Sequence, residues 1–157
     1  MILDKQTHSD LEDGLKKEIE IAKSKISPIL FSYTFEFEAR DLLPLLSHPA
    51  DKNLSRIYWE QPHEGFSLAG LDKTIEITAD SNDSLDQVNK EISNYFKNAI
   101  HVSKYKNPGP RFLGGHSFGL GSQSSGAWDD FPEVCYILPE CLATLTLEGC
   151  WLTISKM

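Results

Sequence analysis

The segment that most constrains the fold is a β-hairpin predicted near the end of the chain, over residues 142–154. Glu148 and Gly149 are expected to form its two-residue turn, because glycine tolerates the positive φ that such turns require. Only three residues follow the second strand, so none remain to pair with it or to cover it. Because uncovered strand edges and apolar faces seek partners, we expect these 157 residues to be part of a longer protein.

Alternating apolar and polar residues predict further strands upstream of the hairpin. Tyr33, Phe35 and Phe37 alternate with polar side chains over residues 30–38, which is typical of a strand with one solvent-exposed face. The other strands are expected over residues 57–60, 65–71, 73–78, 111–120 and 133–138. The turns between the closely spaced strands favour antiparallel pairing.

Two longer segments have the residue spacing of amphipathic helices. Residues 9–25 begin with a capping box, as does a second helix that begins at Ser84 and carries an apolar stripe as far as Ile100. A short helical turn is expected over residues 41–47. Because each long helix has one apolar stripe, each is expected to pack on a single sheet. The predicted fold class is α+β, a single domain over residues 1–157 with an antiparallel β-sheet and helices packed on it.

The charge of the chain limits its expected partners. It carries 23 acidic and 15 basic side chains, and the formal net charge of −8 disfavours contact with phosphate backbones. The lysines of residues 97–106 are too dispersed for a basic surface, so nucleic acid is not expected as a partner. No apolar run approaches the roughly 20 residues that cross a bilayer, and the polar N-terminus is unlike a signal peptide. We expect no membrane partner and a cytoplasmic location, or an organelle stroma after removal of a transit peptide.

The cysteines and tryptophans are expected to be structural. Cys135, Cys141 and Cys150 are odd in number and include no C-x-x-C pair, so they are predicted to be reduced thiols buried on strands. Closely spaced zinc ligands are absent from the sequence, and no metal is expected to bind to this chain. Trp59, Trp128 and Trp151 are expected in the core rather than at a ligand.

A formal match to the nucleophile elbow of serine hydrolases surrounds Ser117, in the sequence GHSFG of residues 115–119. That motif requires a helix after the serine, but residues 120–126 are mostly Gly and Ser and are poor helix formers. The order of residues also fails, because the last histidine of the chain, His116, precedes the serine. The same glycines lack the G-K-[ST] ending of a P-loop and the parallel βαβ unit of a dinucleotide site. Close backbone packing within a sheet is the favoured interpretation.

Two clusters of acidic side chains are candidate catalytic or metal sites. His63 with Glu60 and Glu64 is the best acid–base cluster by composition, but it lies at a proline-containing turn, where polar residues gather because turns are solvated. Asp129 and Asp130 have the chemistry to share a proton or bind Mg²⁺, although adjacent aspartates in a loop are commonly just solvated. Residue chemistry alone indicates a soluble α+β domain without an assigned activity.

Five short motifs, taken together, resemble the isochorismate synthases of the chorismate-utilising family, which also includes salicylate and anthranilate synthases. The motifs are YWEQP at residues 58–62, GFSLAGL at 65–71, PRFLGGHSF at 110–118, WDDFP at 128–132 and VCYILP at 134–139. Their order and spacing are similar to those of the family over residues 58–154. Residues before Leu54 carry no such motif.

The resemblance implies much longer enzymes, built of two stacked α+β halves around a central cleft. Isochorismate synthases convert chorismate to isochorismate with Mg²⁺, a lysine base, a glutamate acid and further glutamates that hold the metal. The resemblance places that lysine just beyond the end of this chain and the glutamates further on. No catalytic, cofactor-binding or metal-binding residue is therefore assigned here, and Lys156 is not in the context of the catalytic lysine.

Two hypotheses follow from the sequence. In the first, the chain is the N-terminal half of an isochorismate synthase of menaquinone, phylloquinone, salicylate or siderophore biosynthesis, inactive alone. Chorismate and Mg²⁺ would then be the partners of the complete enzyme only. In the second, the chain is a non-catalytic module whose last strand pairs with a partner chain that supplies the missing half.

Overall fold

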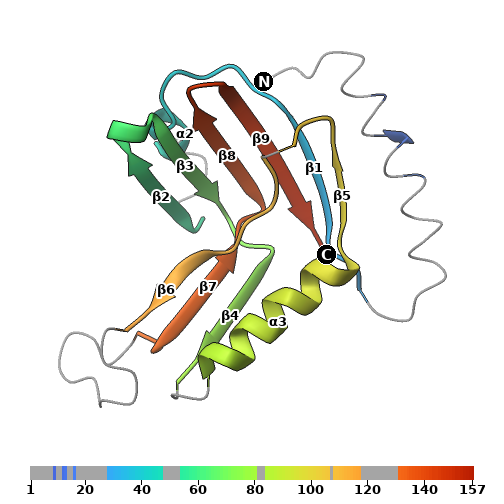
Figure 1. Cartoon of the computed structure of the whole chain (residues 1–157), viewed down its shortest axis with the longest axis vertical. Coiled ribbons are helices and arrows are strands. Elements are labelled where there is room, and N and C mark those ends of the chain that lie inside the picture. Colours follow the sequence, from blue (N-terminus) through green and yellow to red (C-terminus); the bar gives the residue numbers. More distant parts are fainter. Residues whose placement is uncertain are drawn as a thin grey trace.

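The computed structural model describes residues 28–47, 54–80, 84–106, 108–117 and 131–157, together with positions 9, 12, 13 and 16. Most of the helix predicted over residues 9–25 therefore lies outside the described residues, although those four positions are helical. Trp128, Asp129 and Asp130 also lie outside them. Figure 1 shows two sheets joined by short connections, with one long helix beside the smaller sheet.

The larger sheet has six strands in the order β2-β3-β8-β9-β1-β5. In chain order these are β1 Phe31–Glu36, β2 Arg56–Gln61, β3 Phe66–Leu71, β5 Ile100–Ser103, β8 Cys141–Thr146 and β9 Gly149–Lys156. All neighbours pair antiparallel except β1 and β5, which are parallel. A 3₁₀ turn, η1 Pro62–Glu64, joins β2 to β3 where a turn was predicted. The predicted α+β class is confirmed, with one parallel pair in addition.

The last strand is not an edge strand, so the expectation that it would lie uncovered is wrong. β9 pairs with β8 on one side and with β1 on the other, so that Leu152 lies between Ala143 and Phe35. Residues 150–153 are all buried. The hairpin itself was predicted correctly. Its second neighbour was missed because β1 lies more than 110 residues away in the sequence, and alternation within a strand does not identify its partner.

The remaining strands form a second sheet instead of extending the first. It has the order β4-β7-β6, with β4 Ile75–Ala79, β6 Leu113–His116 and β7 Val134–Leu138. The helix α3 Ser84–Asn98 lies along this sheet (Figure 1). Its apolar stripe closes a core with the sheet, formed by Leu30, Ile75, Ile77, Val88, Val134 and Leu138. Packing of this helix on one sheet agrees with the prediction.

The apolar stripe predicted for the second helix extends too far in the sequence. The helix ends at Asn98. Ile100 instead begins β5, and the amide of Ile100 donates to the carbonyl of Leu30 at 2.8 Å. Four residues are too few for alternation to distinguish a strand from the last turn of a helix. Parallel pairing with β1 decides the outcome, and that pairing is a long-range contact.

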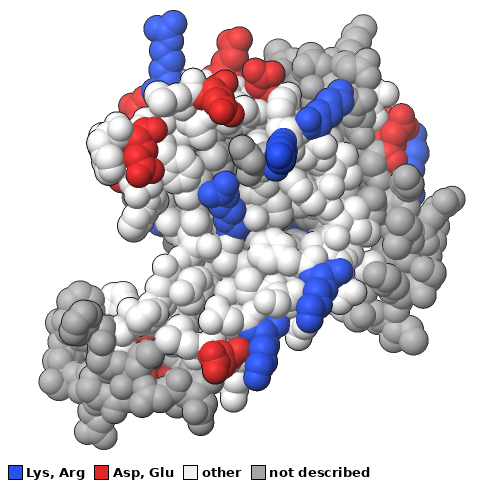
Figure 2. Space-filling model, viewed as in Figure 1, with Lys and Arg blue, Asp and Glu red and all other residues white. Residues whose placement is uncertain are grey.

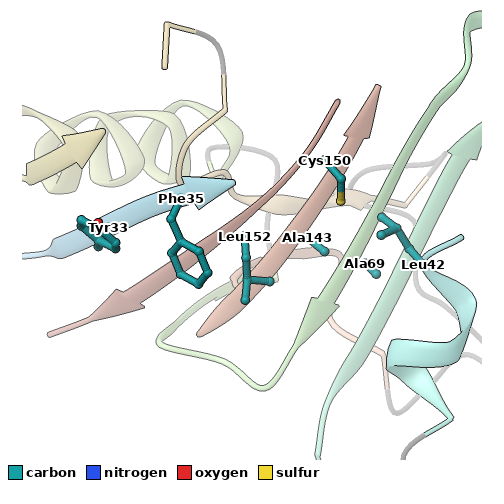
Figure 3. Close-up of a cluster of buried hydrophobic side chains, with 7 residues drawn as sticks. All are labelled: Tyr33, Phe35, Leu42, Ala69, Ala143, Cys150 and Leu152. Carbon is teal, nitrogen blue, oxygen red and sulfur yellow. The ribbon is translucent and has the colours of Figure 1, made fainter. Parts of the chain in front are cut away.

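The two faces of the larger sheet differ in chemistry. One face is apolar, and Figure 3 shows its buried side chains spread along the strands, with Leu42 at the start of the short helix α2 Leu43–Leu46. The buried cluster is formed by Tyr33, Phe35, Leu42, Ala69, Ala143, Cys150 and Leu152. The opposite face buries hydroxyl side chains, namely Ser32, Thr34, Thr144, Thr153 and Ser155. Buried polar side chains require partners, so this second face is the place in the fold where polar groups gather.

Candidate functional site

Three side chains form a hydrogen-bonded row on the polar face, where β9, β1 and β5 lie side by side. Oγ1 of Thr34 is 2.8 Å from Oγ1 of Thr153 and 3.0 Å from Nε2 of His101. Gly109 packs over the imidazole, because a Cβ atom there would lie 2.9 Å from Cε1 of His101. Although His101 is exposed overall, desolvation of its ring lowers the pKa of the imidazole below its ordinary value.

This lowered pKa predicts a pH dependence of stability. As the pH falls below about 6.5, the ordinary histidine pKa, His101 of the unfolded chain binds a proton before His101 of the folded chain does. The free energy of unfolding therefore decreases as the pH falls through this window and is fully retained above it. Chemical denaturation at pH 7.5 and pH 5.5 should show a smaller decrease for His101→Gln than for the unmodified protein. An equal decrease in both proteins would contradict this role of His101.

Beside this row, the link from β5 to β6 crosses the larger sheet (Figure 1) and forms one wall of a pocket. Tyr105 of the link packs against Trp151 of β9, with ring centroids 5.9 Å apart. Its hydroxyl donates to Oε2 of Glu36 at 3.4 Å. Glu36, Trp151 and Thr144 are neighbours in register across β1, β9 and β8, so they share this face. Together the link and the strands enclose about 550 Å³.

Two buried polar atoms of residues that line this pocket have no hydrogen-bond partner. Nε1 of Trp151 and Oγ1 of Thr144 are buried without a hydrogen-bond partner, and both residues line the pocket. Trp151 is 9 % exposed and Thr144 only 2 %. A buried donor without a partner costs roughly 1–3 kcal/mol of stability. Because each atom has less than 1 Å² of accessible surface, neither is reached from the pocket, and both are a cost to the stability of the fold.

The rim of the pocket carries charges of both signs, with cations in excess. Lys104, Lys106 and Arg111 line it together with Glu64 and Glu148, and all five side chains are exposed. In Figure 2, basic side chains lie across the middle of the visible face, while most acidic ones lie along its upper edge. A local excess of cations in a chain of net charge −8 favours an anionic ligand at this position.

The acid–base cluster expected by composition is solvated, as its position at a turn predicted. His63 and Glu64 lie in η1, and Nε2 of His63 is 3.6 Å from Oε1 of Glu64. Their side chains are 78 % and 58 % exposed, and Glu60 is exposed as well. An exposed pair of this kind contributes little energy and excludes no water from a reacting group. Only Glu64 also reaches the pocket described above.

The backbone of the glycine-rich strand β6 packs closely against its neighbour, as the sequence predicted. Gly114 and Gly115 lie in β6, opposite Tyr136 and Cys135 of β7. A Cβ atom on Gly114 would overlap the carbonyl oxygen of Cys135. Ser117 follows the strand, and its amide donates to the carbonyl of Glu133 at 2.7 Å. Close approach of two backbones therefore explains this glycine.

The cysteines lie on strands, as predicted, and none is in a disulfide. Cys150 is buried, whereas Cys135 and Cys141 are half-buried. Burial raises the pKa of Cys141 to about 11, and it also raises the pKa of the other two thiols. Thiols with raised pKa values are poor nucleophiles at neutral pH. These cysteines are therefore structural.

The described part of the chain has neither an evident metal site nor a membrane-spanning helix. No group of three or more His, Cys, Asp or Glu side chains in that part of the chain is arranged to hold a metal ion. Within the same residues, no helix has the length and apolar character needed to span a membrane.

The tryptophans divide between core and surface. Trp151 is buried, as expected, but Trp59 on the edge strand β2 is 56 % exposed, so its assignment to the core was wrong. The sequence analysis also did not anticipate the pocket around Trp151. Its walls come from β8, β9 and the link after β5, and no spacing within one segment marks the three as neighbours.

The model of the chorismate binding enzyme family matches residues 16–157, so the chain belongs to that family. Isochorismate synthase MenF of Bacillus subtilis (strain 168) is 26 % identical over 143 residues. The match covers 86 % of this chain but only 30 % of that protein, so the chain spans less than a third of its relative. No solved structure matches the chain. The family match extends to residues before Leu54, where the sequence showed no motif.

Proposed function

We propose that the chain is the N-terminal part of an isochorismate synthase and supplies scaffold to an enzyme whose reacting groups lie in another part of the polypeptide. The observation that carries this proposal is the match to an isochorismate synthase over 86 % of this chain and only 30 % of the relative. Menaquinone biosynthesis is the pathway that the name of this relative favours. Phylloquinone, salicylate and siderophore pathways are the alternatives.

The Mg²⁺ of the complete enzyme is proposed to bind to residues elsewhere in that enzyme, as the resemblance to the family implies. One structural observation supports a scaffolding role. The matched motifs have packing roles. Gly70 of the GFSLAGL motif faces Pro139, whose Cγ atom would lie 2.8 Å from a Cβ atom at that position. A base, an acid and a metal would have to be positioned by the remainder of the enzyme.

An assay of isochorismate formation tests this proposal. Chorismate and Mg²⁺ are supplied to the purified 157-residue chain and, separately, to the product of the complete reading frame that encodes it. We expect turnover only by a longer product, and a rate for the 157-residue chain at least about 10⁴-fold lower, because positioned catalytic groups are worth that much or more. Addition of a chelator to the longer product is the control for Mg²⁺. Turnover by the purified 157-residue chain would refute the proposal.

A reading frame that ends at Met157 without activity would instead favour the non-catalytic module that pairs with a partner chain. Pairing through the last strand is not available to such a module, because β9 already has a neighbour on each side. Among the strands that the structure describes, β2 and β5 lie at the two ends of the larger sheet.

A further inference from the structure

We propose that two copies of this chain pair with each other in antiparallel orientation through the strand β2, so that their larger sheets join into one sheet across a two-fold axis at Tyr58. Pairing of this kind does not depend on the proposed function. Its failure would leave the isochorismate assay unaffected.

The strand β2 lies at one end of the larger sheet, and β3 is its one neighbour among the strands that the structure describes. In Figure 1 it is the outermost strand at the left of that sheet. None of its six residues is buried. Edge strands are usually protected by proline, lysine, a bulge or a very short length. The sequence RIYWEQ has no proline or lysine, its register with β3 is continuous, and β5 at the other end has only four residues.

The hydrogen bonds to β3 determine which backbone groups of β2 point toward the outer edge. The amide of Asp72 donates to the carbonyl of Ser55 at 2.8 Å, and these two residues continue the register of β2 with β3. In an antiparallel pair, hydrogen-bonded and non-hydrogen-bonded positions alternate along each strand. Positions 57, 59 and 61 are therefore bonded to β3, and the N–H and C=O groups of positions 56, 58 and 60 point outward.

This alternation selects one register for two copies of β2. Outward-pointing groups bond only to outward-pointing groups, so positions 56, 58 and 60 of one copy lie opposite the same three positions of the other. With Tyr58 opposite Tyr58, all three positions of each copy are paired within the strand. A shift by two residues leaves one of the three opposite a residue outside β2. The resulting interface uses the same surface of both copies and is closed by two-fold symmetry.

The side chains are complementary in the same register. Arg56 of each copy lies opposite Glu60 of the other, so the two-fold axis creates two pairs of opposite charge. In the same way Trp59, which is 56 % exposed, lies opposite Ile57. Opposite charges, and an aromatic residue opposite a β-branched one, are favourable cross-strand pairs. Local complementarity is needed because two chains of net charge −8 otherwise repel each other.

The oligomeric state of the product of the complete reading frame tests the proposal. Six residues from each copy form a narrow interface, so the dimer is expected to be weak. Sedimentation over about a hundredfold range of protein concentration should show a monomer–dimer equilibrium, because a weak dimer forms only toward the upper end of such a range. A monomer at every concentration would show that another strand of the polypeptide, or water, covers the edge, and would overturn the proposal.

Reversal of the charges tests the register. Arg56→Glu places like charges opposite each other at both symmetric sites and should weaken the dimer about tenfold. Glu60→Arg should weaken it by a similar factor. The double variant restores opposite charges in this register, so its affinity should return to within about threefold of that of the unmodified protein. No loss in the single variants, or losses that simply add in the double variant, would overturn the proposal.

Lys90→Glu is the matched control for Arg56→Glu, because it changes the net charge equally at an exposed position of α3. We expect it to leave the monomer–dimer equilibrium unchanged. A loss equal to that of Arg56→Glu would show that overall repulsion, rather than the pairing of β2, controls association.

Proline separates pairing at the edge from folding. Glu60→Pro removes an outward-pointing N–H that β3 does not use, and proline is tolerated at such positions of edge strands. We expect this variant to be monomeric, with the circular dichroism spectrum of the unmodified protein. Glu60→Ala keeps the N–H and removes only the carboxylate, so it should weaken the dimer about two- to fivefold. A folded Glu60→Pro variant that still dimerises would overturn the proposal.

Discussion

Replacing Gly114 by alanine is expected to destabilise the protein by about 3 kcal/mol or more, as overpacking and backbone strain act together. The new Cβ atom would overlap the carbonyl oxygen of Cys135 and lie 2.8 Å from Cα of Tyr136. Both atoms belong to the backbone of β7, so no side-chain rotation relieves the contact. The φ angle of 159° is also one that residues with a Cβ atom rarely adopt. Denaturant unfolding followed by circular dichroism measures the loss.

The next residue is the matched control for this substitution. Gly115 lies in the same strand, but a Cβ atom there would meet nothing within 4 Å. Gly115→Ala should therefore change the free energy of unfolding by less than about 0.5 kcal/mol, as is usual for exposed positions without special geometry. Equal losses in the two variants would show that β6 and β7 do not approach as closely as the structure indicates.

This pair of glycines illustrates how far the sequence predicts the structure. Two adjacent glycines inside a strand indicated close packing of backbones, and the structure confirms such packing at Gly114. Which of the two glycines needed to lack a side chain was not predictable. The answer depends on how β6 pairs with β7 within the sheet, and β7 begins eighteen residues after β6 ends, at Val134.

Local sequence patterns predicted most strands, but they did not predict which strands pair when the partners lie far apart in the sequence. The alternation of Tyr33 and Phe35 with hydroxyl residues correctly predicted a strand with two different faces. It was expected that the polar face would be solvated, but Thr34 is 2 % exposed, because Thr153 and His101 lie beside it and the link after β5 covers the sheet. The strand β5 was not predicted, because only its parallel pairing with the distant strand β1 distinguishes it from the end of the helix.

The candidate site was not predictable from the sequence. Thr144 and Trp151 are seven positions apart on two strands and become neighbours only through the register of the β8–β9 hairpin. Two of the three cations, Lys104 and Lys106, come from a stretch that matches none of the motifs, and the motif that contains Arg111 gave no sign of a pocket. Sequence analysis singled out His63 because acid and base were adjacent there, yet adjacency at a turn leaves the groups in water. Burial distinguishes the two places, and burial is a property of the assembled fold.

Replacing Leu152 by alanine should cost about 3 kcal/mol, within the range for leucines truncated in a core. Leu152 is 5 % exposed in the centre of β9, and its side chain lies in the apolar cluster with Phe35 and Ala143 (Figure 3). Because β9 lies between β8 and β1 in the sheet, a cavity at this position weakens packing on both sides of the strand. The same unfolding measurement tests this prediction.

Leu147 is the matched control, because it lies at the turn of the same hairpin and is 87 % exposed. Leu147→Ala removes the same three carbon atoms but should cost less than about 1 kcal/mol, because little apolar surface is returned to water. The difference between the two leucines measures how much the apolar core on this face of β9 contributes to stability. If Leu152→Ala cost no more than Leu147→Ala, the side chain of Leu152 would not be packed in the core as the structure places it.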